Sequence, residues 1–196
     1  MNINLRELQG NWSKGFALNK HTLNSVFIGN NEYGRAMFDT TRSEPGEALY
    51  KLKYKSDFSQ VDPLAQALFD HIVPVIGNFK MIVPMPATKQ RPRQPVMEIA
   101  KKLSDLTDTL YVEELLQKNP PPPGAPQIKD MATKADKVEA LSERFVLNEG
   151  LITDNGKWGA LLVDDRYDSG ASVEAACAVL SKYGKIRELF VATCTW

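Results

Sequence analysis

The chain has 196 residues, of which 43% are hydrophobic and 24% charged, enough for one globular domain with a sizeable core. Its 24 basic residues balance its 24 acidic ones, which argues against a broad nucleic-acid surface. Cys177 and Cys194 are too few for a four-thiolate zinc site or a disulfide framework. No apolar run approaches the roughly 20 residues that cross a bilayer, and residues 1–6 lack a signal-peptide apolar region, so we expect a cytoplasmic protein.

The N-terminal part combines a predicted hairpin with two predicted helices. Residues 25–28 and 33–38 are apolar segments separated by a Gly/Asn turn, the pattern of an antiparallel hairpin. Helices are predicted over residues 47–54 and 63–71, where apolar residues recur at helical spacing. His21 precedes the hairpin, and a lone histidine is more often a hydrogen-bonded structural residue than a catalytic base, so the structural role is favoured and the catalytic one stays open.

A buried strand is predicted over residues 81–84, because the prolines at its end would interrupt a longer sheet ladder. The loop that follows is basic and contains Lys89, Arg91 and Arg93. These cations form either a solvated surface turn or a binding site for an anion, and their place after a strand favours the site. Pro95 begins a helix with one apolar face, and residues 110–112 form a short strand.

The regular pattern dissolves between residues 116 and 144. Residues 119–126 include consecutive prolines, which lack amide donors and favour extended polyproline geometry over helix or sheet. Such a segment is either a linker between domains or a mobile cover over a site. A strand over residues 145–147 is predicted to follow it.

The most informative stretch begins with the apolar run 160–163, which ends at Asp164 and Asp165. A buried parallel strand that delivers acids to its carboxyl end has this pattern. The small, hydroxyl-rich loop 168–172 then opens a helix over residues 173–180, and the amides and dipole of a helix start favour a phosphate. The stretch therefore predicts a ligand with both hydroxyls and a phosphate. The alternative is an Asp-rich turn with an ordinary helix cap.

A final strand is predicted over residues 186–193. The alternation of strands and helices in the second half predicts an α/β fold with a mostly parallel sheet flanked by helices. The sequence shows no internal repeat.

The stretch Leu161–Ser172 resembles the ribose-phosphate signature of type I phosphoribosyltransferases. In that signature a hydrophobic strand, two acids, two apolar residues and a Thr/Ser/Gly loop bind phosphoribosyl pyrophosphate (PRPP). Arg166 and Tyr167 stand where the family usually has apolar residues. Leu-Lys-Tyr-Lys at 52–55 and Val-Pro-Met-Pro at 83–86 are similar to the ComF/GntX-like branch, although the cysteines of that branch's N-terminal zinc module are missing.

The resemblance implies a type I phosphoribosyltransferase fold in which residues 1–196 form a single domain. Residues from about 1 to 60 would form an N-terminal extension that contributes a hood, and residues from about 61 to 196 the core. Residues from about 117 to 143 would form the flexible loop that covers the active site.

The resemblance also implies where PRPP binds. The residues for its 5′-phosphate would be Asp168, Ser169, Gly170, Ala171 and Ser172. Those for its pyrophosphate would be Thr88, Lys89, Arg91 and Arg93. Candidate cations of the flexible loop are Lys129, Lys134 and Lys137, with a solvated surface role as the alternative. Asp164 and Asp165 would face the ribose hydroxyls, and Mg²⁺ would be held mainly by pyrophosphate and ribose oxygens, with these acids reaching it through water.

The implied activity is the transfer of ribose 5-phosphate from PRPP, with Mg²⁺, to a small nitrogenous acceptor such as a purine base, with release of pyrophosphate. Asp164, Asp165 and Asp168 would be the catalytic residues, Asp168 as a general base or base-recognition group, with capping of the next helix as the alternative. A second hypothesis is a non-catalytic regulatory or competence-associated ComF-like protein that binds PRPP or a nucleotide. Arg166, and Ala140 where ComF-like sequences have Asn, keep it open. A homodimer is compatible with the resemblance, and no membrane partner is expected.

Overall fold

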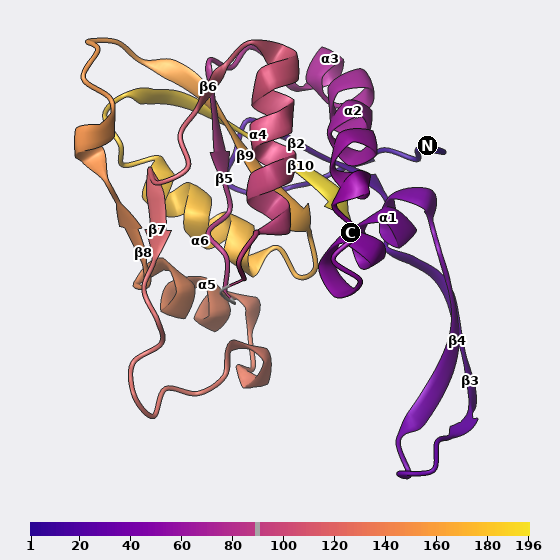
Figure 1. Ribbon diagram of the computed structural model, residues 1–196. Helices are drawn as coiled ribbons and strands as arrows, with labels where there is room; N and C mark the ends of the chain where they lie inside the picture. The colour runs from indigo at the N-terminus through magenta and orange to yellow at the C-terminus, as the bar shows by residue number, and fades with distance from the viewer. Residues whose placement is uncertain (89–90) are drawn as a thin grey trace.

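The computed structural model describes residues 1–88 and 91–196, and its centre is a six-stranded sheet (Figure 1). The strand order is β1-β2-β10-β9-β5-β6. Every neighbouring pair is parallel except β1 with β2. The strands are β1 (Arg6–Glu7), β2 (Lys14–Asn19), β5 (Met81–Pro84), β6 (Leu110–Tyr111), β9 (Trp158–Arg166) and β10 (Ile186–Thr195). The predicted α/β class with a mostly parallel sheet is confirmed.

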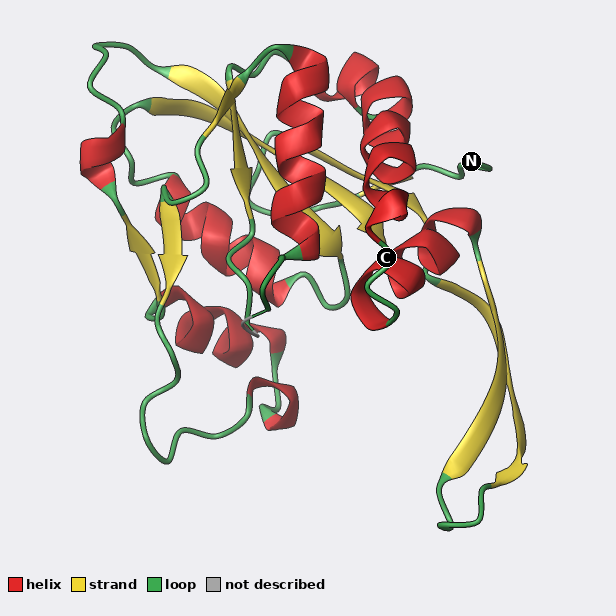
Figure 2. Cartoon of the chain, in the orientation of Figure 1, coloured by secondary structure: helices red, strands yellow, loops and turns green. Residues whose placement is uncertain are grey.

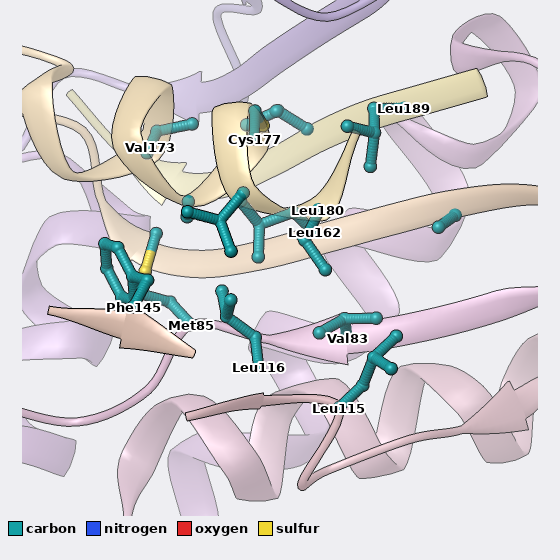
Figure 3. Close-up of a cluster of buried hydrophobic side chains, with 14 of the residues drawn as sticks. Val83, Met85, Leu115, Leu116, Phe145, Leu162, Val173, Cys177, Leu180 and Leu189 are labelled. Carbon is teal, nitrogen blue, oxygen red and sulfur yellow. The ribbon is translucent and has the colours of Figure 1, made fainter. Parts of the chain in front are cut away.

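Strand β9 lies at the middle of the sheet because its side chains are apolar on both faces. Leu161 and Val163 join one buried cluster, while Ala160 and Leu162 join the other. Figure 3 shows the second cluster, in which residues of helix α6 (Ala171–Leu180) lie over Leu162. The strand thus delivers its last residues from a fixed, doubly covered position.

Helices cover both faces of the sheet, as Figure 2 shows. On one face lie α1 (Glu44–Tyr54), α2 (Val61–His71), α3 (Val73–Ile76) and α4 (Pro95–Thr107). The other face carries α6, against which α5 (Lys134–Ser142) packs, and a small antiparallel sheet of β7 (Leu116–Lys118) and β8 (Phe145–Leu147). Short 3-10 helices cover Phe58–Gln60, Ile128–Asp130 and Glu149–Leu151. None of the helices in the described residues has the length and apolar composition needed to cross a membrane.

The predicted hairpin is present but longer than expected, with strands β3 (Thr22–Asn30) and β4 (Ala36–Arg42). It projects from the body as a separate two-stranded sheet (Figure 1). Helix α1 follows at once and begins at Glu44, three residues earlier than predicted. The Ser43 side chain caps it by accepting from the Gly46 amide at 3.1 Å, and the same hydroxyl donates to the Lys20 carbonyl at 2.5 Å.

Two of the elements that were not predicted, strand β2 and helix α5, bear on the site. Strand β2 pairs in parallel with β10, so the first sixty residues supply part of the central sheet as well as the hairpin. Helix α5 lies within the segment expected to lack regular structure, and that expectation is wrong for residues 134–142. The helix forms because Thr133 and Asp136 make a reciprocal capping box at its start.

Candidate functional site

The acid pair lies at the carboxyl end of β9, between the ends of β5 and β10. The Asp165 amide donates to Asp164 Oδ1 at 2.8 Å. Lys53 Nζ, from the last turn of α1, lies 2.8 Å from Asp165 Oδ2. Both side chains of this ion pair are largely buried, at 21% and 17% exposed. The two acids are therefore held in different environments, one beside a cation and one beside the sheet.

Burial is the main cause that raises the pKa of Asp164, to about 7, and the neighbouring charge of Asp165 raises it further. The amide of Asp165 and the cations Lys53 and Lys118 act in the opposite direction. Near neutral pH the pair thus carries less than two full negative charges. A ligand with hydroxyl groups can donate to the charged carboxylate and accept from a protonated one.

The turn after the acid pair is shaped by Gly170, which starts α6 with a φ of +80°. A Cβ at this glycine would lie 2.3 Å from the Tyr167 hydroxyl oxygen. Tyr167 is buried, and its ring meets Trp12 edge to face at 6.4 Å between centroids. The tyrosine thus fills the space beneath the turn, and only glycine fits above it.

The start of α6 offers backbone donors to a cavity of about 380 Å³. Gly170 has no side chain to cap the helix, and the Ala171 amide donates to Ser169 Oγ at 3.4 Å. The other amides of the first turn have no partner within the helix. The cavity is lined by Ile128, Lys137, Leu141, Asp164 and residues 166–173. Amides, the helix dipole and the lysine together favour an anion such as a phosphate.

Replacing Gly170 by alanine should destabilise the fold by about 2–4 kcal/mol, since the left-handed backbone and the contact with Tyr167 both add cost. Gly124→Ala is the matched control, because Gly124 also has a positive φ, +78°, but nothing lies within 4 Å of its Cβ position. It should cost only about 1–2 kcal/mol. Urea unfolding midpoints check both values, and equal losses would contradict the close packing of Tyr167.

A second cavity of about 330 Å³ is lined by both residues of the acid pair. Its charged and polar lining is Lys53, Tyr54, Thr88, Arg91, Gln94, Lys118, Asp164, Asp165, Arg166 and Ser172. Asp164, Arg166 and Ser172 line both cavities, which therefore adjoin. The carboxylates lie between an anion-favouring turn and a group of cations.

The predicted pyrophosphate residues are brought together only in part. Thr88 and Arg91 line the second cavity, and Thr88 Oγ1 accepts from Lys118 Nζ at 3.1 Å. Arg93 lies instead over the Phe58 ring at 3.9 Å and pairs with Glu98 at 2.8 Å, outside that cavity's lining. Lys89 lies outside the described residues.

The predicted loop cations also separate. Lys137 faces the cavity at the start of α6. Lys134 forms an ion pair with Glu174, which fastens α5 to α6, and it lines neither cavity among the described residues. The side chain of Lys129 lies outside the described part of the structure. Of the two lysines whose side chains the structure describes, Lys137 is therefore the one positioned for a ligand at the turn.

Two site lysines escaped the sequence analysis. Lys53 was noted only as part of Leu-Lys-Tyr-Lys, and no local pattern linked it with Asp165. Lys118 ends β7, and burial, followed by the positive charge of Arg144, lowers its pKa. Its position just before the prolines offered no sequence signal. An anion bound beside Lys118 would stabilise its charge.

His21 is held at the end of β10. Its amide donates to the Trp196 carbonyl at 2.8 Å, and its Nδ1 lies 3.2 Å from Thr195 Oγ1. Burial, then the charges of Arg166, Arg42 and Lys53, lowers the pKa of His21 to about 4. The imidazole is therefore neutral near pH 7. His21 lines neither cavity among the described residues, which agrees with the structural role favoured above.

The acid pair lacks a third carboxylate, histidine or cysteine ligand among the residues that the structure describes. In the part of the chain that the structure describes, no three His, Cys, Asp or Glu residues are placed to hold an ion together. Of the two acids, Asp165 is already paired with Lys53. This donor set fits a divalent cation that arrives on an oxygen-rich ligand and meets the carboxylates through water.

Fold and site together define an α/β protein with a polar, anion-favouring cleft at the carboxyl edge of a parallel sheet. No protein-family model and no curated protein matches the sequence. Among solved structures, the chain is similar to adenine phosphoribosyltransferase from Thermoanaerobacter pseudethanolicus, at 10% identity and a TM-score of 0.45 over 85% of this chain and 82% of that one.

Two further similarities are to proteins of the same name. The Leishmania tarentolae protein matches at 10% identity and a TM-score of 0.49, over 98% of this chain and 94% of that one. The Saccharomyces cerevisiae protein, in complex with an imino-altritol bisphosphate and adenine, matches at 14% identity and a TM-score of 0.42, over 86% and 83%. At these values the likeness carries no information on residue roles.

Proposed function

We propose that this chain is a phosphoribosyltransferase of the type I fold, which binds PRPP with Mg²⁺ and transfers ribose 5-phosphate to a nitrogenous acceptor. One observation carries the proposal: Asp164 and the turn 168–172 line the same cavity at the end of one strand. A sugar phosphate needs its hydroxyls and its phosphate bound a few ångströms apart. The strand and the helix start supply acceptors for the former and donors for the latter.

The remaining groups of PRPP are assigned by charge. The 5′-phosphate is bound by residues 168–172 with Lys137, and the ribose hydroxyls by Asp164 and Asp165. The pyrophosphate occupies the second cavity, where Thr88 and Arg91 are joined by the newly found Lys118. Lys89 stays a proposed pyrophosphate ligand from its sequence position alone, because it lies outside the described residues. Candidate pyrophosphate ligands thus line a cavity that adjoins the phosphate turn, as a single extended ligand requires.

In the transfer, the bond between the anomeric carbon and pyrophosphate breaks and a bond from that carbon to the acceptor nitrogen forms. Positive charge develops on the ribose, which the acids stabilise, and negative charge on the leaving pyrophosphate, which the cations stabilise. Bound Mg²⁺ supplies further charge neutralisation on the pyrophosphate oxygens.

A purine base is the proposed acceptor class, with Asp168 as the group that takes the acceptor's proton or recognises its ring. Asp168 is exposed in the turn and lines the cavity that also contains Asp164. An exposed carboxylate in that place can accept a hydrogen bond from a ring N–H. The structure gives Asp168 no capping bond to α6, which leaves the carboxylate available among the described contacts.

The finer parts of the proposal concern architecture. We propose that the chain is a single domain and that it belongs to the ComF/GntX-like branch. We also propose that residues 117–143 close over bound PRPP. Lys137 on α5 supports the closure, because a ligand at the start of α6 would contact both helices. A homodimer is proposed as the working form.

The second candidate, a PRPP sensor without efficient transfer, is favoured by the Lys53–Asp165 ion pair. The carboxylate that the ribose needs is already occupied by a cation 2.8 Å away. A ribose hydroxyl would share this carboxylate with Lys53 and would meet an acid whose charge is already partly neutralised. Binding without turnover would follow if the contact persisted.

Calorimetry with PRPP and Mg²⁺, followed by pyrophosphate release across a panel of purines, other bases and amines, tests the proposal. An enzyme gives binding and release with at least one acceptor. Binding without release on any acceptor identifies the sensor. The absence of both would show that the cleft serves another ligand.

Lys118→Met should weaken PRPP binding about 10- to 100-fold, because a partly buried cation contributes about 1.5–3 kcal/mol through charge-assisted hydrogen bonds. Lys102→Met is the matched control, since Lys102 forms a surface ion pair with Asp62 and such pairs contribute little. Titration calorimetry measures both affinities. Equal PRPP affinities for the two variants would show that Lys118 does not bind the ligand.

A further inference from the structure

The β3–β4 hairpin, here called the arm (residues 22–42), stands apart from the body (Figure 1). No other strand among the described residues pairs with it. A lone two-stranded hairpin is marginally stable in water, because it buries little apolar surface. Because the arm is long and isolated, we expect another surface to cover it in solution.

The arm exposes an unusual amount of apolar surface. Its large apolar side chains are between 40% and 78% exposed, and they are Leu23, Val26, Phe27, Ile28, Tyr33, Met37 and Phe38. Phe27 and Phe38 are register partners near the middle of the arm, and their rings meet edge to face at 5.7 Å. This aromatic pair is shared between the two strands but is open on its outer side.

The edges of the arm carry few of the features that keep strands from pairing with other chains. Residues 22–42 contain neither proline nor lysine, the residues that most often protect exposed edges. Two register irregularities, near residues 23 and 28, twist the ribbon without covering it. The arm is thus suited to contact another protein surface.

The charges of the arm favour a second copy over a membrane. Glu32 and Asp39 balance Arg35 and Arg42, so the arm is formally neutral. Amphipathic segments that bind membrane surfaces are instead rich in Lys and Arg on their polar face. Arg42 is held at the root of the arm by Glu47, at 3.4 Å, and by the Tyr50 ring, at 3.9 Å, so it faces the body of its own chain. The remaining charges of the arm, Glu32, Arg35 and Asp39, do not form the basic face that an anionic membrane would attract. The charge pattern therefore favours a protein partner, here a second copy of the chain, over a membrane.

The area also fits. If each of the seven apolar side chains exposes about half of the 150–250 Å² of a large aromatic residue, the arm offers on the order of 700 Å² over its two faces together, because successive strand residues point to opposite faces. Each partner in a standard protein interface contributes about 800 Å². A partner chain that covers both faces of the arm would therefore bury an area close to that of a standard interface.

We propose that the arm is the interface between two copies of this chain, packed antiparallel about a two-fold axis beside Phe27 and Phe38. The inference is independent of the proposed function, because no arm residue lines either cavity in the described structure. It identifies the arm as the contact through which a homodimer forms.

Sedimentation equilibrium of the full chain tests the interface. Wild type should be a dimer, and the Phe27→Ser, Phe38→Ser double variant should dissociate at least 100-fold more easily while its circular dichroism is retained. The control is Val75→Ser with Leu110→Ser, which removes two exposed apolar side chains from the body and should leave the dimer intact. A monomeric wild type, an unaffected arm variant, or arm-dependent binding of wild type to lipid vesicles would overturn the proposal.

Cross-linking tests the symmetry separately. Under mild oxidation, Ser25→Cys, near the proposed axis, should give a disulfide dimer, whereas Tyr33→Cys, at the tip, should not, because antiparallel arms hold their tips apart. The native Cys177 and Cys194 are buried and should not contribute. Cross-linking at the tip but not near Phe27 would contradict the antiparallel contact.

Discussion

Replacing both Asp164 and Asp165 by asparagine should abolish phosphoribosyl transfer while leaving the fold intact. Each acid is expected to accept a charge-assisted hydrogen bond from a ribose hydroxyl, worth about 1.5–3 kcal/mol. Losing two such bonds predicts a 10²- to 10⁴-fold fall in kcat/KM, since each 1.36 kcal/mol is a factor of ten. Pyrophosphate release measures the loss, and circular dichroism verifies the fold.

The matched control removes two carboxylates that lie on helix surfaces. Asp62 and Asp105 each form an ion pair with a lysine, and their side chains are 73% and 61% exposed. The double change Asp62→Asn, Asp105→Asn should leave transfer within about twofold of wild type, because exposed pairs contribute little. Unchanged turnover in the Asp164, Asp165 variant would show that the acids do not bind the sugar.

The single change Asp164→Asn should stabilise the folded protein at pH 8, even though it weakens the site. Burial and the charge of Asp165 raise the pKa of Asp164 to about 7, so its ionised form is disfavoured in the fold. Asparagine keeps the oxygen that accepts from the Asp165 amide but removes the charge. We expect a gain on the order of 2–4 kcal/mol.

The stability gained by Asp164→Asn should increase as the pH rises. The folded protein binds the Asp164 proton more tightly than the unfolded chain, so ionisation costs stability progressively between about pH 4 and pH 7 and fully above that range. The variant's advantage should therefore be large at pH 8 and nearly absent at pH 4. Urea unfolding of both proteins at the two pH values measures it. A variant less stable than wild type at pH 8 would show that Asp164 is stabilised by its cations instead.

The sequence identified the elements whose residues are buried on both faces. The predicted strands at 81–84, 160–163 and 186–193 each contain a continuous apolar run, which in the last is 189–192, and all three became neighbouring strands. The acid pair and the glycine turn were also found, because chain order alone places them at the end of one strand. Local patterns suffice where neighbours in sequence are neighbours in space.

Elements defined by distant contacts were missed. The sequence Lys14–Asn19 contains Gly15 and begins with a lysine, and it becomes β2 only through its pairing with β10. Helix α5 was obscured by the adjacent prolines, and within it only Leu141 is buried. Its Thr133 and Asp136 cap was the available signal, although aspartate is less usual than Glu or Gln at that position.

The cations of the site were also missed where their contacts join residues that are distant in the sequence. Lys53 and Asp165 are more than one hundred residues apart, and Lys118 approaches Thr88 from a different sheet. Conversely, Arg93 belonged to the right loop but turned to Phe58 and Glu98. A long side chain can reach several partners, and the assembled fold determines which of them it contacts.

Ser43 alone separates the last residue of β4 from the first residue of α1. Its hydroxyl bridges the Lys20 carbonyl and the Gly46 amide, so the junction is as stiff as the helix it begins. Lys53 lies near the opposite end of that helix, against Asp165. A change in the direction of the arm that tilts α1 is therefore expected to move Lys53, about 10 residues along the helix, relative to Asp165.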